Sequence, residues 1–148
     1  MNEEIDVLLS DILALVKSKN RRLMEKYNIT PLQYRALKII RDKRPTMGDL
    51  CELLYLSSST VTELVDRLED NNLVVRVRSR EDRRVVILEI TEEGIALLEK
   101  IQGEKLEVLN KALNLLDEIE RDEIREALIK LRKVLKEDKG EDKRDSGS

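Results

Sequence analysis

The chain has 148 residues, a net charge of −3, no histidine and a single cysteine, Cys51. This composition excludes an internal disulfide and a cysteine-based zinc site and argues against histidine-dependent catalysis. Composition alone does not exclude an Asp/Glu metal site or carboxylate catalysis, but the sequence contains no clustered constellation for either, so we expect no catalytic residues, no metal site and no cofactor. No apolar run approaches the length of a membrane span and the N-terminus does not resemble a signal peptide, so we expect one soluble, cytoplasmic domain without a membrane partner.

The basic residues are concentrated in two blocks. Residues 17–45 contain ten basic and two acidic residues, and residues 76–90 contain five basic and three acidic ones. The segment between these blocks, residues 46–75, contains one basic and six acidic residues. Despite the negative total, this distribution is typical of a protein with one nucleic-acid face and a separate assembly face.

Residues 3–26 are predicted to form a long helix. Its apolar residues Ile5, Leu8, Ile12 and Leu15 repeat at alternating spacings of three and four residues. An ordinary core helix and a helix that packs on a second chain both fit this stripe.

A second helix is expected to begin at Thr30-Pro31, because threonine is a preferred N-cap and proline a preferred first helical residue. It should end before Pro45, since the residue preceding a proline is pushed out of the helical conformation. Its basic side chains are candidate phosphate contacts, although a solvated face is the simpler interpretation of any single one. They are Lys38, Arg41, Lys43 and Arg44.

Two short helices should follow, joined by a tight turn at residues 55 and 56. Thr46 with Asp49 has the spacing of a capping box, and Ser57 is the expected N-cap of the second helix. Such a pair forms a helix-turn-helix, whose second helix enters the major groove N-terminus first. Cys51 falls on the apolar side of the first helix and is interpreted as a small core residue rather than a reactive thiol. The second helix offers five candidate DNA contacts, namely Ser57, Ser58, Ser59, Thr62 and Arg67.

This second helix also carries acidic residues, which do not suit a phosphate-rich partner. Glu63 has two interpretations: it accepts a hydrogen bond from cytosine in the groove, or it pairs with Arg67 four residues on, which we favour. The helix therefore supplies little phosphate attraction, and affinity must depend on residues 35–44 and on the segment that follows.

That segment is predicted to be a β-hairpin. Residues 73–78 and 85–90 are rich in β-branched side chains and bracket the charged sequence SREDRR. Asn71-Asn72 can adopt the left-handed conformation that ends the preceding helix. A hairpin of this type acts as a wing that contacts phosphates or places an arginine in the minor groove.

At these residues the chain resembles the MarR family of winged-helix repressors. Asp82-Arg83-Arg84, followed by residues 86–91 and Glu93-Gly94, is similar to the family's D-x-R…L-x-L-T-x-x-G run. Residues 61–68, Leu73-Val74 with Arg76, and residues 30–34 are also similar to family segments. The similarity covers roughly residues 23–98, and the helix layout extends it to almost the whole chain.

The resemblance implies roles for the wing and for an effector pocket. Arg84 would make the minor-groove contact with Asp82 orienting it, although this pair also fits a salt bridge that merely shapes the turn; Arg80 and Arg83 would contact phosphates. Small aromatic or anionic effectors would bind near Arg21, Arg22, Tyr27 and Tyr34, for which core and solvent roles are the simpler interpretation.

The apolar pattern after residue 91 is helical again, first to about residue 116 and then from Asp117 onward. We therefore predict a mainly α fold with a small β-hairpin wing, in a single domain covering residues 1–148. A winged helix-turn-helix lobe at about 30–92 is flanked by dimerisation helices at 3–28 and about 95–136, and 137–148 is predicted to be disordered.

The expected function is that of a homodimeric, sequence-specific regulator, in particular a repressor released by a small molecule. Its partners would be double-stranded DNA with a pseudo-palindromic operator and a second copy of itself. The alternative is a winged-helix module that binds protein and has only weak DNA affinity.

Overall fold

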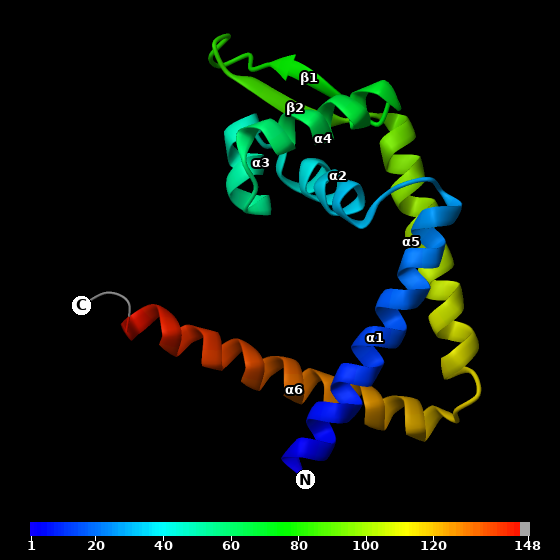
Figure 1. The fold of residues 1–148 in the computed structure, drawn as a ribbon. Helices are drawn as coiled ribbons and strands as arrows, with labels where there is room; N and C mark the ends of the chain where they lie inside the picture. Colours follow the sequence, from blue (N-terminus) through cyan, green and yellow to red (C-terminus); the bar gives the residue numbers. More distant parts are fainter. Residues whose placement is uncertain (146–148) are drawn as a thin grey trace. The chain divides into compact units, whose positions relative to one another are not determined.

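The computed structural model describes residues 1–145 of the chain, and side chains as far as residue 138. It is mainly α-helical with one antiparallel hairpin, as predicted (Figure 1). Two compact units are present, Met1–Lys105 and the chain from Leu106 onward, and each is described separately below. The elements are α1 (Asn2–Lys26), α2 (Pro31–Lys43), α3 (Met47–Leu54), α4 (Ser58–Asp70), β1 (Val74–Arg78), β2 (Val86–Ile90), α5 (Glu92–Leu113) and α6 (Glu118–Asp145).

The starts of α2, α3 and α4 follow the predicted caps. The Thr30 hydroxyl accepts from the Gln33 amide at 3.1 Å, and the Gln33 side chain accepts from the Thr30 amide at 3.0 Å. Thr46 and Asp49 make the same reciprocal pair at 3.1 and 3.2 Å. Ser57 caps α4 by accepting from an amide three residues on. These bonds satisfy amide groups that have no partner within the helix, so each start is fixed by its own sequence.

The hairpin packs beside α4, and the two strands pair from Val74 opposite Ile90 to Arg78 opposite Val86 (Figure 1). Asn72 adopts the expected left-handed conformation, with φ of 59°, and turns the chain from α4 into β1. The sequence did not indicate a third extended segment, which joins the hairpin from the α2–α3 connection. There the Leu88 amide donates to the Pro45 carbonyl at 2.8 Å, and Thr46 forms an isolated antiparallel β-bridge with Ile87. The wing is therefore attached to the start of α3 as well as to α4.

The core of the first unit is almost entirely aliphatic, with Tyr34 as its one buried aromatic residue, in a chain with no Phe or Trp. α4 buries its four apolar residues, which recur at helical spacing: Val61, Leu64, Val65 and Leu68. The first turns of α5 close the core beside the hairpin. Cys51 is half-buried and packs against this core, which agrees with its interpretation as a small apolar residue. The buried apolar residues are Met24, Ile29, Tyr34, Ala36, Leu37, Ile40, Leu50, Leu54, Val61, Leu64, Val65, Leu68, Val74, Leu88, Leu98 and Ile101.

Thr91 and Gly94 join the start of α5 to the turn between α4 and β1. The Thr91 hydroxyl donates to the Asn72 carbonyl at 2.6 Å and accepts from the Gly94 amide at 3.0 Å. The Thr91 amide donates to the Leu73 carbonyl at 3.0 Å. One residue thus caps α5 and fixes it to the winged lobe, by which we mean α2, α3, α4, β1 and β2.

Replacing Thr91 with valine is expected to lower the free energy of unfolding by about 1–2 kcal/mol. The Gly94 amide and the Asn72 carbonyl would lose their hydrogen-bond partner, while the shape of the side chain is kept. Urea unfolding followed by circular dichroism measures this loss. Thr62→Val serves as the control, since Thr62 is exposed and donates only to Ser58 within its own helix. An equal, small effect of both substitutions would contradict the role assigned to Thr91.

α1 buries only Met24 among its residues and leaves its apolar stripe exposed. In the second unit, the end of α5 and the described part of α6 also expose large apolar residues, among them Leu109, Ile124 and Leu128. α6 continues to Asp145, so the chain is helical where the sequence predicted disorder from residue 137 to that point, and residues 146–148 lie outside the described residues.

Candidate nucleic-acid interface

The N-terminal half of α4 presents hydroxyl groups on the side opposite its buried face. Ser57, Ser58, Ser59 and Thr62 are all exposed, as predicted for residues that approach DNA. Ser57 also caps the helix, and the Thr62 hydroxyl donates to the Ser58 carbonyl at 2.8 Å, leaving its oxygen as an acceptor. Because helix amides at the N-terminus point outward, this end of α4 suits a phosphate or a base edge.

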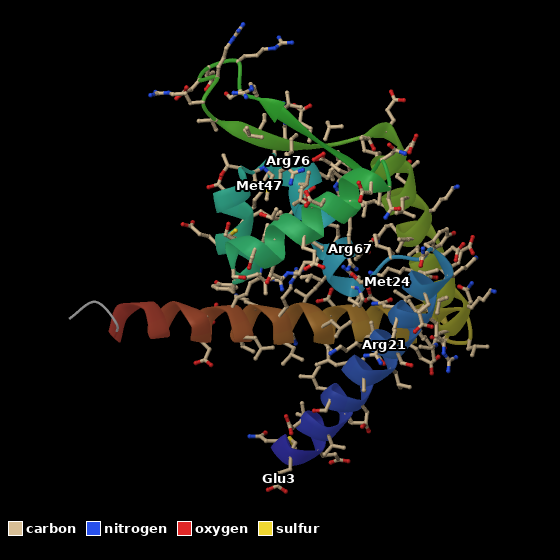
Figure 2. The ribbon with its side chains drawn as sticks, turned by 45° about the horizontal axis from the view of Figure 1, so that its top comes forward. Glu3, Arg21, Met24, Met47, Arg67 and Arg76 are labelled. Carbon is tan, nitrogen blue, oxygen red and sulfur yellow. The ribbon has the colours of Figure 1, made fainter. Side chains whose placement is uncertain are left out.

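The acidic residues of α4 are largely paired. Glu63 accepts from the Arg67 guanidinium at 3.1 Å, which confirms the pairing that the sequence favoured. Asp66 and Glu69 both accept from Arg76 on β1, at 2.8 Å for Asp66. Figure 2 shows Arg76 between the hairpin and α4. In the sequence Arg76 stands out only by its charge and its place in the family pattern, and this contact was missed because seven to ten residues separate the partners.

The tip of the wing is organised around Asp82 and Arg84. The Asp82 carboxylate accepts from the Arg84 amide at 3.1 Å and from two guanidinium nitrogens at 3.1 and 3.2 Å. The hydrogen bonds from the Arg84 side chain, and then from its amide, hold the pKa of Asp82 below its usual value. The Arg84 side chain remains 90% exposed. The pair therefore shapes the turn and aims a guanidinium outward at the same time.

Other arginines surround this tip. Arg80 and Arg83 are exposed, as expected of candidate phosphate contacts. Arg78 donates to the Arg83 carbonyl at 3.0 Å, which braces the loop between the strands. The sequence contained no local signal for this brace, since Arg78 precedes the loop and reaches across it.

The basic residues of α2 divide into different environments. Lys43 is exposed at the end of the helix, and Arg41 pairs with the neighbouring Asp42 at 2.8 Å. Arg44 adopts a left-handed conformation and forms a salt bridge with Glu89 on β2, so it fastens α2 to the wing. Lys38 is half-buried, and its ammonium lies 4.8 Å from the centre of the Tyr34 ring. Lys43 and Arg41 therefore fit a phosphate contact better than Lys38 does.

The residues proposed to bind an effector occupy separate environments. Arg21 and Arg22 are exposed on α1, while Tyr34 is buried and its hydroxyl accepts from Lys105 at 3.4 Å. Tyr27 is half-buried and donates to Glu104, whose pKa is held below its usual value by Lys26 and then by Tyr27. Of the four, Arg21 lines a groove of about 340 Å³ between α1 and the start of α2, and the other three are not among the lining residues of that groove. The lining residues are Leu13, Val16, Lys17, Asn20, Arg21, Met24 and Pro31, and Figure 2 shows Arg21 and Met24 along α1.

Within the described part of the chain, no group of three or more Cys, Asp or Glu residues lies close enough to hold a metal ion. None of the helices described here combines the length and the apolar character that a membrane span requires.

Comparison with known proteins gives consistent matches. A model of the MarR family matches residues 27–85. YsmB, an uncharacterised HTH-type transcriptional regulator of Bacillus subtilis, is 32% identical over 134 residues, covering 90% of this chain and 92% of YsmB. The structure of a MarR family protein from Bacillus stearothermophilus is 32% identical with a TM-score of 0.79, covering 90% of this chain and 94% of that one. A mutant of S. aureus MepR, bound to an oligodeoxyribonucleotide, is 25% identical with a TM-score of 0.72, covering 88% of this chain and 97% of that one.

Proposed function

The chain belongs to the MarR family, whose members are DNA-binding transcriptional regulators rather than enzymes, and we propose that it acts as a homodimeric repressor of a pseudo-palindromic operator. The observation that carries this proposal is the pairing, in one lobe, of an exposed hydroxyl face on α4 with an exposed, carboxylate-held Arg84 on the wing. Together they offer one element for the major groove and one for the adjacent minor groove.

The homodimer is supported by the apolar surface outside the winged lobe. Large apolar residues on α1, on the end of α5 and on α6 are half or more exposed in the single chain, among them Leu8, Ile12, Leu109 and Leu128. Surfaces of this kind mark protein interfaces when they are continuous. We propose that residues 3–28 and about 95–136 form the dimer contacts. The two copies of α4 would then address half-sites about 34–36 Å apart.

We also propose that a small molecule releases the repressor from DNA, and that it binds in the groove lined by Arg21 rather than beside all four residues suggested by the sequence. The groove that includes Arg21 is lined mainly by apolar residues together with two cations, Lys17 and Arg21, which suits an aromatic acid. Tyr34 is less suited to a direct contact because only 4% of it is exposed.

The experiment that tests the DNA-binding site replaces Arg84 with alanine. Affinity for an operator duplex, enriched from a random library by the wild-type protein, is expected to fall at least about tenfold, because the arginine proposed to enter the minor groove is lost. Fluorescence anisotropy at fixed salt measures the dissociation constant. Arg121→Ala, on α6 outside the winged lobe, is the charge-matched control, and sedimentation velocity establishes that it is still dimeric because residue 121 falls in the segment proposed for the dimer contacts. Unchanged binding by Arg84→Ala would contradict the assignment, and a wild-type protein that enriches no duplex would contradict the proposed function.

The acidic residues of α4 favour a second candidate, a winged-helix module that binds protein and has weak DNA affinity. The two candidates differ in salt dependence. Phosphate contacts make the binding constant fall steeply with salt: its logarithm decreases by about 0.9 per phosphate contact for each tenfold rise in salt concentration. A shallow dependence on random duplex DNA would favour the protein-binding module.

A further inference from the structure

The surface that faces DNA in this proposal contains an electrostatic conflict. α4 carries Glu63, Asp66, Glu69 and Asp70 and a single basic residue, Arg67. Charges closer together than the Debye length, about 8 Å at physiological salt, are only partly screened from each other. Two carboxylates free to approach phosphates would therefore weaken binding noticeably.

Arg76 lies where this conflict would be relieved. Its guanidinium donates through one terminal nitrogen to Asp66, at 2.8 Å, and through the other to Glu69. The Arg76 and Glu69 side chains are each 31% exposed, and Asp66 is 55% exposed. The hydrogen bond to Asp66, followed by that to Glu69, raises the pKa of Arg76 above its usual value.

The contact also has a defined mechanical consequence. Arg76 lies on β1 opposite Leu88, whereas Asp66 and Glu69 lie on α4. A planar guanidinium that uses both terminal nitrogens fixes two carboxylates in one plane, which a lysine ammonium cannot do. The same side chain therefore sets the position of the wing on the reading helix, α4, and holds two carboxylates toward the hairpin.

We propose that Arg76 is a positioning residue for DNA binding: it holds the Asp66 and Glu69 carboxylates against the wing and keeps their charge away from the phosphates. This inference rests on the proposed function, because it concerns how the same surface tolerates DNA. Arg76 itself makes no DNA contact in this account. Its effect on affinity passes entirely through the two carboxylates.

The test compares three variants with the wild type on the operator duplex enriched by the wild-type protein. Arg76→Met releases both carboxylates and is expected to weaken binding about tenfold, since like charges face each other in the complex. Asp66→Asn/Glu69→Gln keeps Arg76 and is expected to bind at least as tightly as the wild type. The triple variant removes the arginine together with both charges and is expected to return to within about threefold of the wild type.

The matched control is Arg125→Met. Arg125 also bridges two carboxylates, Asp122 at 2.7 Å and Glu126 at 3.0 Å, but it lies on α6. Because residue 125 falls in the segment proposed for the dimer contacts, sedimentation velocity first establishes that Arg125→Met is still dimeric. With the dimer intact, this variant should leave affinity unchanged. Thermal unfolding of each variant in the binding buffer establishes that the folded fraction is the same in every titration, so a loss of stability is not read as a loss of affinity.

The rescue decides between the roles open to Arg76. A triple variant as weak as Arg76→Met, with the salt slope reduced by about one phosphate contact, would show that Arg76 touches DNA directly and would overturn the inference. Wild-type affinity in folded Arg76→Met would overturn it as well, while leaving the proposed function intact. A wild-type protein that enriches no duplex would instead overturn the proposed function.

Discussion

Replacing Gly94 with alanine is expected to lower the free energy of unfolding by about 3 kcal/mol, because no space exists for the added methyl group. A Cβ atom at this position would lie 2.4 Å from the Leu73 carbonyl oxygen and 2.6 Å from Cγ1 of Ile90. Leu73 belongs to the turn before β1 and Ile90 ends β2, so neither neighbour can move without disturbing the hairpin. The Gly94 amide also donates to the Thr91 cap, which prevents the helix from shifting away.

The same helix provides the control for this prediction. Gly103 also lies in α5, and nothing lies within 4 Å of a Cβ atom built there. Gly103→Ala is therefore expected to raise the free energy of unfolding by about 0.5–1 kcal/mol, through helix propensity alone. Urea titration of both variants, followed by circular dichroism, measures the opposite signs. Equal effects would mean that the chain around Gly94 relaxes to accept the methyl group.

Gly94 also explains a feature of the sequence that pattern alone left without a cause. The resemblance rested partly on a threonine followed three residues later by glycine. In the structure, the start of α5 lies directly against the turn between α4 and β1. The Thr91 hydroxyl is therefore needed to hydrogen-bond this turn and the Gly94 amide, and Gly94 has no room for a side chain. The motif therefore records a close approach of backbone to backbone rather than a contact with DNA.

The parts of the fold that the sequence predicted correctly depend on neighbouring residues. Thr30 with Gln33, Thr46 with Asp49, and Ser57 each fix a helix start across three residues. The left-handed turn at Asn72 is local in the same sense. In each case the interacting groups are close in sequence whatever the rest of the chain does, so composition and spacing suffice to predict them.

Contacts between distant segments could not be predicted in this way. The salt bridge from Arg44 to Glu89 spans 45 residues, and the pairing of the Pro45 carbonyl with Leu88 is similarly remote. Arg44 was predicted as a phosphate contact because its charge is evident from the sequence, whereas its salt-bridge partner Glu89 is not. The contact of Lys38 with the Tyr34 ring was not predicted for the same reason. Helical periodicity indicates the side of the helix on which a residue lies, but not which residue of another segment it contacts there.

The candidate site shows the same division. The Asp82–Arg84 pair is two residues apart, and the sequence indicated both its salt bridge and its exposure. The two carboxylates that Arg76 holds were visible only as an unexplained excess of acid on α4. The four effector candidates share a suitable chemistry near the connection between α1 and α2, yet Arg22, Tyr27 and Tyr34 are not among the residues that line the groove there.

Replacing Ile12 with glutamate is expected to dissociate the proposed homodimer and to lower affinity for a two-half-site operator by about a hundredfold or more, because each lobe then binds alone. Ile5, Leu8, Ile12 and Leu15 form a stripe along α1 that is 47–61% exposed in the single chain. A carboxylate placed at the centre of this stripe would be buried without a partner when two chains meet. The winged lobe makes no use of Ile12, so its fold should be retained.

Ser10→Glu is the matched control, since it adds the same charge to the same helix away from the stripe. Sedimentation velocity gives the oligomeric state of both variants. Anisotropy on duplexes with one and with two half-sites separates the affinity of a single winged lobe from the gain that comes from joining two lobes in a dimer. Ile12→Glu is expected to match the wild type on the single half-site and to lose only the gain from the second. A dimeric Ile12→Glu that binds both duplexes like Ser10→Glu would exclude this face of α1 as the interface. The exposed stripe would then need another partner, and the spacing of the two reading helices would have to be set by α5 and α6 alone.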